Sequence, residues 1–343
     1  MMYSFVNDYS EGAHPKVLDL LMKSNLEQNN GYGTDVHCDR AKEHIKKHLE
    51  KDDVDIHFIP GGTQTNLLVI SAFLRPHQCV IAADTAHINV HETGAVEATG
   101  HKVVTIAAPD GKLTPSAILS ALNYHRDEHM VQPKMVYISD STELGTIYTK
   151  AELTAIQSIC KENGLYLFLD GARLASALTC RTNDLTLADI AQLTDVFYIG
   201  GTKNGALLGE ALVICNDGLK EDFRYLIKQR GAMMAKGFVM GNQFEALFQE
   251  DLYFELGAHA NRMAERIADA IERAGYRFYT TPCSNQLFPV LPYQILDKLS
   301  GQFKFEVQKE MKEFTVVRFV TSWATTQESV DALCSFFLGD GQS

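Results

Sequence analysis

Two ionisable side chains follow apolar runs of the sequence, at positions where a solvated surface residue is not expected. Lys203 follows the run Val196–Ile199 inside a glycine-rich loop, and Asp170 comes directly after the run Tyr166–Leu169. A lysine that is removed from water has a lowered pKa, and its free amine can form a Schiff base with a carbonyl group. A buried aspartate needs a cationic partner, and either Arg173 or a bound protonated heterocycle would serve.

Two further segments offer groups that suit a phosphate and an aromatic ring. The stretch Pro60–Thr63 joins a predicted strand to a predicted helix, so its bare backbone amides and the helix dipole could bind a phosphate. The alternative is an ordinary turn that ends in a threonine cap. His87 follows the apolar run Cys79–Ala82. It is either a histidine of the core or a ring that lies flat on an aromatic ligand.

Taken together, these groups describe one ligand, pyridoxal 5′-phosphate (PLP). Its phosphate would bind at Gly62 and Thr63, and its aldehyde would bind Lys203. Its pyridine nitrogen would face Asp170, which keeps the nitrogen protonated and so makes the ring an electron sink. His87 would cover one face of the ring. The sequence therefore predicts a PLP site.

The elements that must position these groups alternate between short β-rich runs and longer helical runs. The predicted strands are Asp55–Ile59, Cys79–Ala82, Val103–Ile106, Lys134–Ser139, Tyr166–Leu169, Val196–Ile199 and Ala211–Cys215. The predicted helices include Gln64–Leu74, Pro115–His125, Lys150–Glu162 and Asp189–Leu193. Most of the strands are apolar with little alternation, which is typical of strands that are covered on both faces. The pattern predicts a three-layer α/β/α domain with a mostly parallel sheet, whose ligands bind at the carboxyl ends of the strands.

The interval between Asp170 and Lys203 leaves room for one helix and one strand, which would bring both residues to the same edge of the sheet. After Gly241 a long helical stretch is predicted over Phe244–Ala274. Strands at Tyr276–Tyr279, Gln286–Leu291 and Phe314–Val320 and a final helix at Gln327–Phe337 complete the chain. We expect an N-terminal arm and a large domain over residues 1–243, and a small α+β domain over residues 244–343.

The composition limits the possible partners and compartments. The chain has 343 residues and a net charge of −12, so neither nucleic acid nor an anionic membrane is an expected partner. Its seven cysteines show no Cys-x-x-Cys spacing, which favours free thiols in a reducing compartment. The N-terminus does not resemble a signal peptide, and no apolar run has the length of a membrane span. We expect a cytoplasmic protein.

The motifs that carry these groups resemble the threonine aldolase and β-eliminating lyase family of fold-type-I PLP enzymes, and within it the low-specificity L-threonine aldolases. The resemblance runs nearly end to end. It rests on Asn7–Ser10, Gly31-Tyr32-Gly33, Pro60–Thr63, Ala86-His87, Glu92–Ala95, Leu169–Arg173, Gly200–Gly205 and Val317–Trp323. The Asp-Gly-Ala-Arg and Thr-Lys elements are the most specific of these motifs.

The resemblance implies a role for each matching residue. Lys203 would hold the cofactor covalently, and Gly62, Thr63 and Thr202 would surround its phosphate. Lys236 matches a basic position that reaches a phosphate across a subunit interface. Arg173, which also belongs to the cofactor site, and Arg318 would bind the substrate carboxylate, while Asn7 and Asp8 match an arm near the site. These assignments imply a homo-oligomer, a dimer or a tetramer with shared sites.

The implied reaction cleaves the Cα–Cβ bond of L-threonine or a related β-hydroxy-α-amino acid, which gives glycine and an aldehyde. Where better-studied aldolases have a histidine near the substrate hydroxyl, this sequence has Glu143. The base that takes the hydroxyl proton is therefore open between Glu143, His87 and the cofactor phosphate.

Other functions remain open on the sequence alone. A β-eliminating lyase or an aminotransferase would share Lys203 and Asp170, because these reactions differ in which bond at Cα is held perpendicular to the ring. A catalytically silent protein of the same fold has no need of these ionisable groups. His87 and His91, which precede Glu92 and lie one helical turn apart, could bind zinc, but no third ligand is evident and we expect no metal.

Overall fold

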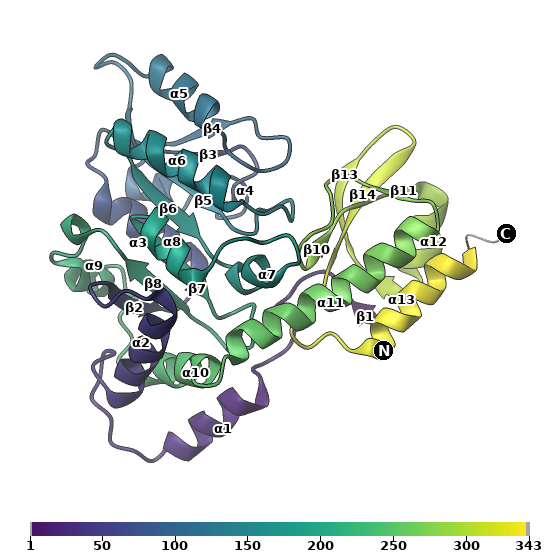
Figure 1. Cartoon of the computed structure of the whole chain (residues 1–343), viewed down its shortest axis with the longest axis horizontal. Helices are drawn as coiled ribbons and strands as arrows, with labels where there is room; N and C mark the ends of the chain where they lie inside the picture. Colours follow the sequence, from purple (N-terminus) through teal and green to yellow (C-terminus); the bar gives the residue numbers. More distant parts are fainter. Residues whose placement is uncertain (1, 341–343) are drawn as a thin grey trace.

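The computed structural model describes residues 2–340 and contains two lobes, which the long helix α11 joins (Figure 1). The larger lobe is built on a seven-stranded sheet in the order β2-β8-β7-β6-β5-β3-β4. Its strands are β2 (Asp55–Ile59), β3 (Gln78–Ala83), β4 (Val103–Ile106), β5 (Gln132–Ser139), β6 (Tyr166–Asp170), β7 (Val196–Gly200) and β8 (Glu210–Ile214). Only the two pairings that involve β8 are antiparallel. The expected mostly parallel sheet is confirmed.

Helices pack on both faces of this sheet. Every residue of β3, β7 and β8 is buried, so both faces of these strands are covered. The helical elements of this lobe are α1 (Pro15–Ser24), α2 (Val36–Leu49), α3 (Gly62–Phe73), α4 (His87–Val90), η1 (Glu97–Thr99), α5 (Pro115–Tyr124), α6 (Lys150–Glu162), α7 (Leu174–Thr179), α8 (Leu187–Leu193), η2 (Asp217–Leu219), α9 (Phe223–Gln229) and α10 (Phe238–Phe248). This arrangement is the predicted three-layer α/β/α domain. None of the helices in residues 2–340 is both long enough and apolar enough to cross a membrane.

The smaller lobe is an antiparallel sheet that is covered by helices. Its strands are β9 (Arg277–Phe278), β10 (Gln286–Leu287), β11 (Pro289–Pro292), β13 (Glu306–Glu310) and β14 (Phe314–Val320), and its helices are α11 (Leu252–Arg273), α12 (Tyr293–Ser300) and α13 (Gln327–Asp340). The single helix predicted over Phe244–Ala274 is wrong. Asp251 adopts a left-handed conformation, with φ of 58°, which separates α10 from α11.

The N-terminal arm lies against the smaller lobe. Strand β1 (Tyr3–Ser4) pairs in parallel with β12 (Phe303–Lys304), and Phe5 packs into the hydrophobic core of the smaller lobe. The two cores meet along α11, because Leu256 packs in the larger core and Met263 in the smaller one. The domain division at residues 243 and 244 stays a prediction, and Met1 and residues 341–343 lie outside the described residues.

Candidate active site

The carboxyl ends of β6 and β7 approach each other so closely that only glycine fits between them. A Cβ atom on Gly171 would lie 1.9 Å from the backbone oxygen of Tyr198, and the amide of Gly200 donates to the oxygen of Gly171 at 3.0 Å. Asp170 ends β6, and Lys203 follows β7 by three residues. The glycines therefore bring the predicted carboxylate and the predicted amine to the same edge of the sheet, although two helices rather than one separate β6 from β7.

Lys203 has a free amine in this arrangement. Its Nζ makes no hydrogen bond or ion pair with any residue between positions 2 and 340. Burial lowers the pKa of Lys203, and the positive charge of Arg173 lowers it further, against the raising effects of Asp8, Asp170 and Glu210. A lowered pKa favours the neutral amine, which is the form that attacks a carbonyl group.

A buried glutamate fixes the loop that carries Lys203. Glu210 accepts hydrogen bonds from the amide of Gly201 and from the hydroxyl of Thr202, both at 3.0 Å. Burial raises the pKa of Glu210 to about 8. The Thr202 hydroxyl has one hydrogen, which it donates to Glu210, so its predicted phosphate contact is left to its backbone amide. The role of Glu210 was not foreseen from the sequence, although this glutamate begins the apolar strand β8 (Glu210–Ile214).

Three donors orient the carboxylate of Asp170. The amide of Ala172 donates to Oδ1 at 3.0 Å, while the Tyr137 hydroxyl and Asn66 Nδ2, the latter at 3.2 Å, donate to Oδ2. Arg173, one of the two cationic partners that the sequence offered for Asp170, pairs with another carboxylate. The remaining candidate is the protonated nitrogen of a bound heterocycle.

Asn66 and Glu92 connect Asp170 to His87. The same amide nitrogen of Asn66 donates to Glu92 Oε1 at 2.7 Å, and His87 Nδ1 lies 2.7 Å from that oxygen. Glu92 is buried, whereas the His87 side chain is 34% exposed. The Nδ1–H group therefore donates to Glu92, which leaves Nε2 of His87 as the ring nitrogen that can exchange a proton. The role of Asn66 was not foreseen from the sequence, because it lies inside an apolar helix.

The Glu143 side chain contacts His87, the first residue of α4, and so joins the other groups of the site. Its Oε1 accepts from the backbone amide of His87 at 3.0 Å and from the Ser139 hydroxyl at 2.7 Å. Burial raises the pKa of Glu143, and the negative charge of Asp170 raises it further. Glu143 thus holds His87 in place through its backbone amide, and the role of Glu143 as the base stays a prediction.

The N-terminus of α3 fits the predicted phosphate. Its N-cap residue, Gly61, provides no side-chain hydrogen bond, so no side chain caps the first amides of the helix. A Cβ atom on Gly61 would meet nothing within 4 Å, so there is open space beside the helix end. Gly62 and Thr63 are the first two residues of α3, and uncapped amides at this place suit an anion.

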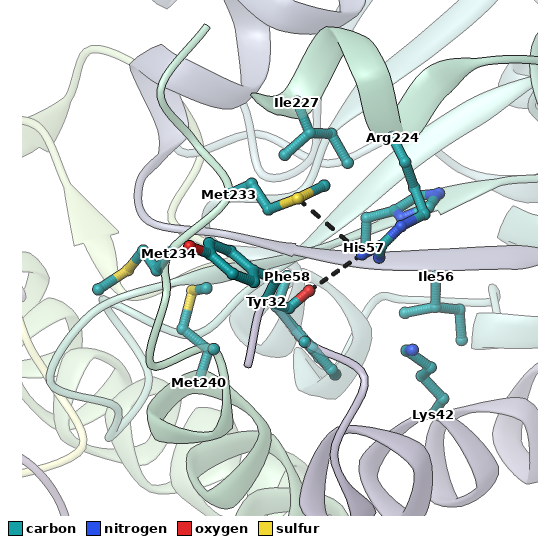
Figure 2. Close-up of a pocket in the computed structure, with 12 residues that line it drawn as sticks. Tyr32, Lys42, Ile56, His57, Phe58, Arg224, Ile227, Met233, Met234 and Met240 are labelled. Atoms are coloured by element: carbon teal, nitrogen blue, oxygen red, sulfur yellow. Dashed lines mark hydrogen bonds between the residues drawn. The ribbon is translucent and has the colours of Figure 1, made fainter. Parts of the chain in front are cut away.

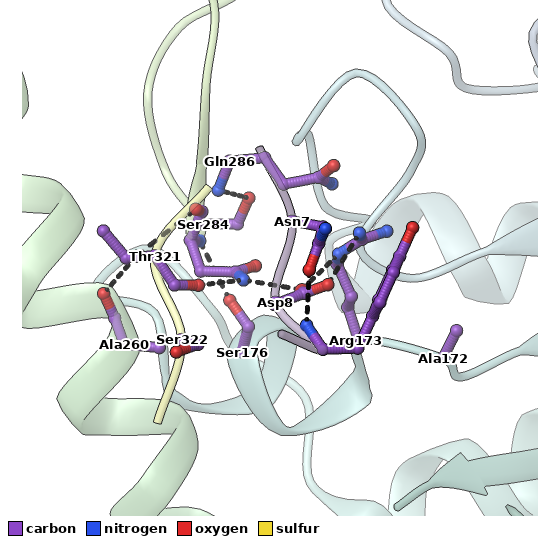
Figure 3. Close-up of polar contacts among 12 residues, drawn as sticks. Asn7, Asp8, Ala172, Arg173, Ser176, Ala260, Ser284, Gln286, Thr321 and Ser322 are labelled. Carbon is purple, nitrogen blue, oxygen red and sulfur yellow. Dashed lines mark hydrogen bonds and ion pairs between the residues drawn. The ribbon is translucent and has the colours of Figure 1, made fainter. Parts of the chain in front are cut away.

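Arg173, which the sequence predicts to bind the substrate carboxylate, forms an ion pair with Asp8 of the N-terminal arm (Figure 3). Arg173 donates from Nε to one oxygen of Asp8 at 2.7 Å and from Nη2 to the other at 3.0 Å. Asn285 donates to the same carboxylate at 2.9 Å. Although burial acts to raise the pKa of Asp8, Arg173 and Lys203 hold it below its ordinary value. Asn7 directly precedes Asp8 in the chain, and the side-chain oxygen of Asn7 accepts a hydrogen bond from the amide of Tyr9 at 3.0 Å.

Arg318 approaches the site from β14. Its Nη2 donates to the backbone oxygen of Val6 at 3.3 Å and to the carboxylate of Glu306. Burial lowers the pKa of Arg318, and the nearby charge of Arg173 lowers it further. The two arginines therefore share one positive region, which suits a carboxylate ligand.

Lys236 is the one predicted residue that its own chain does not bring to this site. It is exposed in the loop before α10, where the amide of Tyr32 donates to the oxygen of Ala235 at 3.1 Å. No hydrogen bond or ion pair among residues 2–340 joins Lys236 to Lys203. Figure 2 shows the small pocket behind this loop, which is lined by His57 among other residues. Burial lowers the pKa of His57 to about 3, so that ring is neutral.

Comparisons with known proteins agree with this geometry. Residues 11–291 match the family model described as β-eliminating lyase. The low specificity L-threonine aldolase of a Pseudomonas species is 32% identical and covers 96% of both chains, and the protein of the same name from Pseudomonas aeruginosa is 31% identical over 96% of this chain and 95% of its own. The solved structure of a threonine aldolase from Leishmania major has a TM-score of 0.98 and 54% identity to this chain, and the match covers 99% of each chain. An aspartate aminotransferase from Thermus thermophilus has a TM-score of 0.73 at 13% identity, over 98% of this chain and 91% of its own, which shows a shared fold.

Proposed function

The chain belongs to the β-eliminating lyase family, and we propose that its site cleaves L-threonine, L-allo-threonine and related β-hydroxy-α-amino acids into glycine and an aldehyde. It is a PLP-dependent lyase with the fold of type I PLP enzymes. The relatives that match over nearly the whole chain are named threonine aldolases. The likeness to aminotransferases shows the fold alone, so aldol cleavage is favoured over amino transfer.

One observation carries the assignment to this site. Lys203, whose amine is free, and Asp170, whose carboxylate is held by three donors, lie at adjacent strand ends beside the uncapped helix that begins at Gly62. The residues thus fit PLP. Lys203 would hold its aldehyde, Asp170 its pyridine nitrogen, and the amides of Gly62 and Thr63 its phosphate.

When bound, PLP supplies an electron-withdrawing ring that stabilises the negative charge left on the α-carbon as its bond to the β-carbon breaks. The chain must hold the substrate so that this bond is the one that breaks. Arg173 and Arg318 would do so by fixing the substrate carboxylate, because a guanidinium group restrains a carboxylate in both distance and plane.

We propose His87 as the base for the β-hydroxyl proton. Its Nδ1–H group is committed to Glu92, so Nε2 is the nitrogen that accepts a proton, and the side chain is partly open to the site. A proton taken up at Nε2 would give an imidazolium ion beside the Glu92 carboxylate, which stabilises that ion. Glu143 would position His87 through its backbone amide.

A second copy of the chain would complete the site. Lys236 is exposed, and Tyr32 beside it is 47% exposed, so both side chains are accessible to a partner subunit. On α1, Met22 is 75% exposed, and Leu26 after the helix is 91% exposed, which provides apolar surface for a partner. We propose a dimer or a tetramer in which Lys236 contacts the phosphate bound by the neighbouring subunit.

All seven cysteines are free, which suits our proposal of a cytoplasmic protein.

The test of the function is the set of products from each substrate. Purified protein with added PLP is mixed with L-threonine and, in a parallel reaction, with L-allo-threonine. Aldol cleavage gives acetaldehyde and glycine, whereas elimination gives 2-oxobutanoate from the same substrates. Amino transfer would require a keto acid and give no acetaldehyde, so the three reactions are distinguished by their products.

A further inference from the structure

Both arginines proposed for the substrate carboxylate already hold a carboxylate of the chain itself. Arg173 holds Asp8, and Arg318 holds Glu306. Glu306 lies on β13 directly opposite Arg318 in the antiparallel pairing with β14, so the two side chains meet across the strands. This pair was not foreseen from the sequence, because the mostly exposed residues of β13 were not predicted as a strand.

The two pairs differ in how easily a ligand could replace them. Asp8 is 1% exposed, accepts two bonds from Arg173 and is held by Asn285 as well. Glu306 is 38% exposed, and its contact with Arg318 is with one nitrogen only. The next four residues of β13 are all exposed. Removal of Asp8 would leave a buried charge unpaired, whereas Glu306 can rotate into water.

The geometry of a guanidinium group makes Glu306 a competitor for the substrate. A carboxylate binds such a group with two bonds either at the Nη1/Nη2 edge or at the Nε/Nη2 edge, so Nη2 belongs to both edges. In Arg318 the two hydrogens of Nη2 are taken by Glu306 and by the backbone oxygen of Val6. Nε of Arg318 is buried and has no hydrogen-bond partner within residues 2–340. A two-bond clamp on a ligand therefore requires Nη2 to be released.

The edge of Arg173 that faces away from Asp8 stays available. Asp8 takes Nε and one hydrogen of Nη2, and the Nη1/Nη2 edge makes no further hydrogen bond or ion pair with the described residues. Arg173 can thus bind a second carboxylate without losing Asp8, but Arg318 cannot bind one with two bonds while it keeps Glu306. Only Arg318 carries an exchangeable partner.

We propose that Glu306 is an internal stand-in for the substrate carboxylate, which occupies Arg318 in the free enzyme and is exchanged for the carboxylate of the incoming amino acid. The exchange replaces one carboxylate by another, so Arg173 and Arg318 never face each other without a counter-charge. In the reverse direction Glu306 displaces the carboxylate of glycine and assists product release. Because Glu306 lies on the strand next to Arg318, it competes with the substrate carboxylate at a high effective concentration. This inference rests on the proposed role of Arg318.

The test compares Glu306→Gln with Glu310→Gln in the PLP-loaded enzyme. Glu310 ends the same strand and is exposed, and it pairs with Thr315 rather than with Arg318, so its variant removes the same charge without touching the arginine. We expect Glu306→Gln to lower the KM for L-threonine by about fivefold, as loss of a half-exposed competing pair predicts, with no rise in kcat. Glu310→Gln should leave both constants unchanged.

Binding of glycine to the loaded enzyme, measured by calorimetry, separates this inference from the proposed function. The dissociation constant of glycine should fall by about the same factor in Glu306→Gln, whether or not threonine is cleaved. Glu306→Ala, with a circular dichroism spectrum of the folded protein, serves as a second variant. An unchanged or higher KM and glycine dissociation constant in both variants would overturn the proposal and make Glu306 a residue that orients Arg318.

Discussion

His87 Nδ1 lies 2.7 Å from Glu92 Oε1, and the same oxygen accepts Asn66 Nδ2 at 2.7 Å. Glu92 thus sets both the orientation and the tautomer of the ring. Glu92→Gln keeps an oxygen acceptor but removes the charge, and we expect kcat to fall about 10-fold; Glu92→Ala should lower it about 100-fold. Initial rates at saturating L-threonine measure both effects.

The control for this prediction is Glu97→Gln, because Glu97 is exposed five residues further along. It should retain the kcat of the unaltered enzyme. If Glu92→Ala also retained that kcat, His87 would not be held by Glu92 for proton transfer.

The buried pair of Asp8 and Arg173 should contribute strongly to stability. Asp8→Asn leaves the guanidinium without its charged partner, and breaking a buried pair in this way costs about 3 kcal/mol. Urea unfolding of both proteins gives the difference in the free energy of unfolding. Asp19→Asn, at an exposed site on α1, is the control, and its effect should stay below about 0.5 kcal/mol. Equal losses in the two variants would show that the arm is not anchored by this pair.

A buried histidine on α2 should make stability depend on pH. His37 is 2% exposed and lies 2.6 Å from Glu245 and 2.7 Å from Glu27, with Arg40 3.5 Å from Glu245. Burial acts to lower the pKa of His37, but hydrogen bonds to the two glutamates outweigh burial and raise it. The folded pKa then exceeds the unfolded value of about 6.5, so the stabilisation is full below about pH 6.5 and is lost as pH rises through the folded pKa.

We therefore expect the difference in melting temperature between the unaltered protein and His37→Gln to be larger at low pH than at alkaline pH. His44→Gln on the same helix is the control, since His44 makes no such pair. A difference that is constant across pH would mean that His37 stays neutral in the folded protein.

Shared sites predict that two inactive variants restore each other. Lys203→Ala lacks the amine, and Lys236→Ala should bind PLP about 10-fold more weakly if it contacts the phosphate of the neighbouring subunit. At a PLP concentration that leaves each variant nearly inactive, an equal mixture after random subunit exchange should return about a quarter of the normal activity, because about half of the dimers are mixed and one of the two sites in each mixed dimer is intact. No recovery in a sample shown to exchange subunits would place Lys236 outside the site.

Much of the fold was predictable because each strand is a short apolar run. β2 (Asp55–Ile59) and β4 (Val103–Ile106) have the predicted bounds, and the other strands of the main sheet differ by one or two residues. The break at Asp251 was not predictable, since it depends on one left-handed residue inside a helical pattern. β13 was missed because its exposed residues follow no apolar alternation.

The residues of the candidate site likewise include some that the sequence predicts and others that it does not. Lys203 and Asp170 were evident because a charge directly after an apolar strand is unusual. Asn66, which orients Asp170, has no sequence signal of this kind, because its partner lies 104 positions away in the chain. The pairing of Arg173 with Asp8 joins residues 165 positions apart, so only the structure could decide which carboxylate the arginine holds.

The most direct test of the central claim is the yield of acetaldehyde and glycine from L-threonine, compared between the unaltered protein and Lys203→Ala, both with added PLP. We predict equal amounts of the two products from the unaltered protein. Lys203→Ala should give neither product and should lack the visible absorbance of lysine-bound PLP. Formation of 2-oxobutanoate without acetaldehyde, or full activity of Lys203→Ala, would contradict the account.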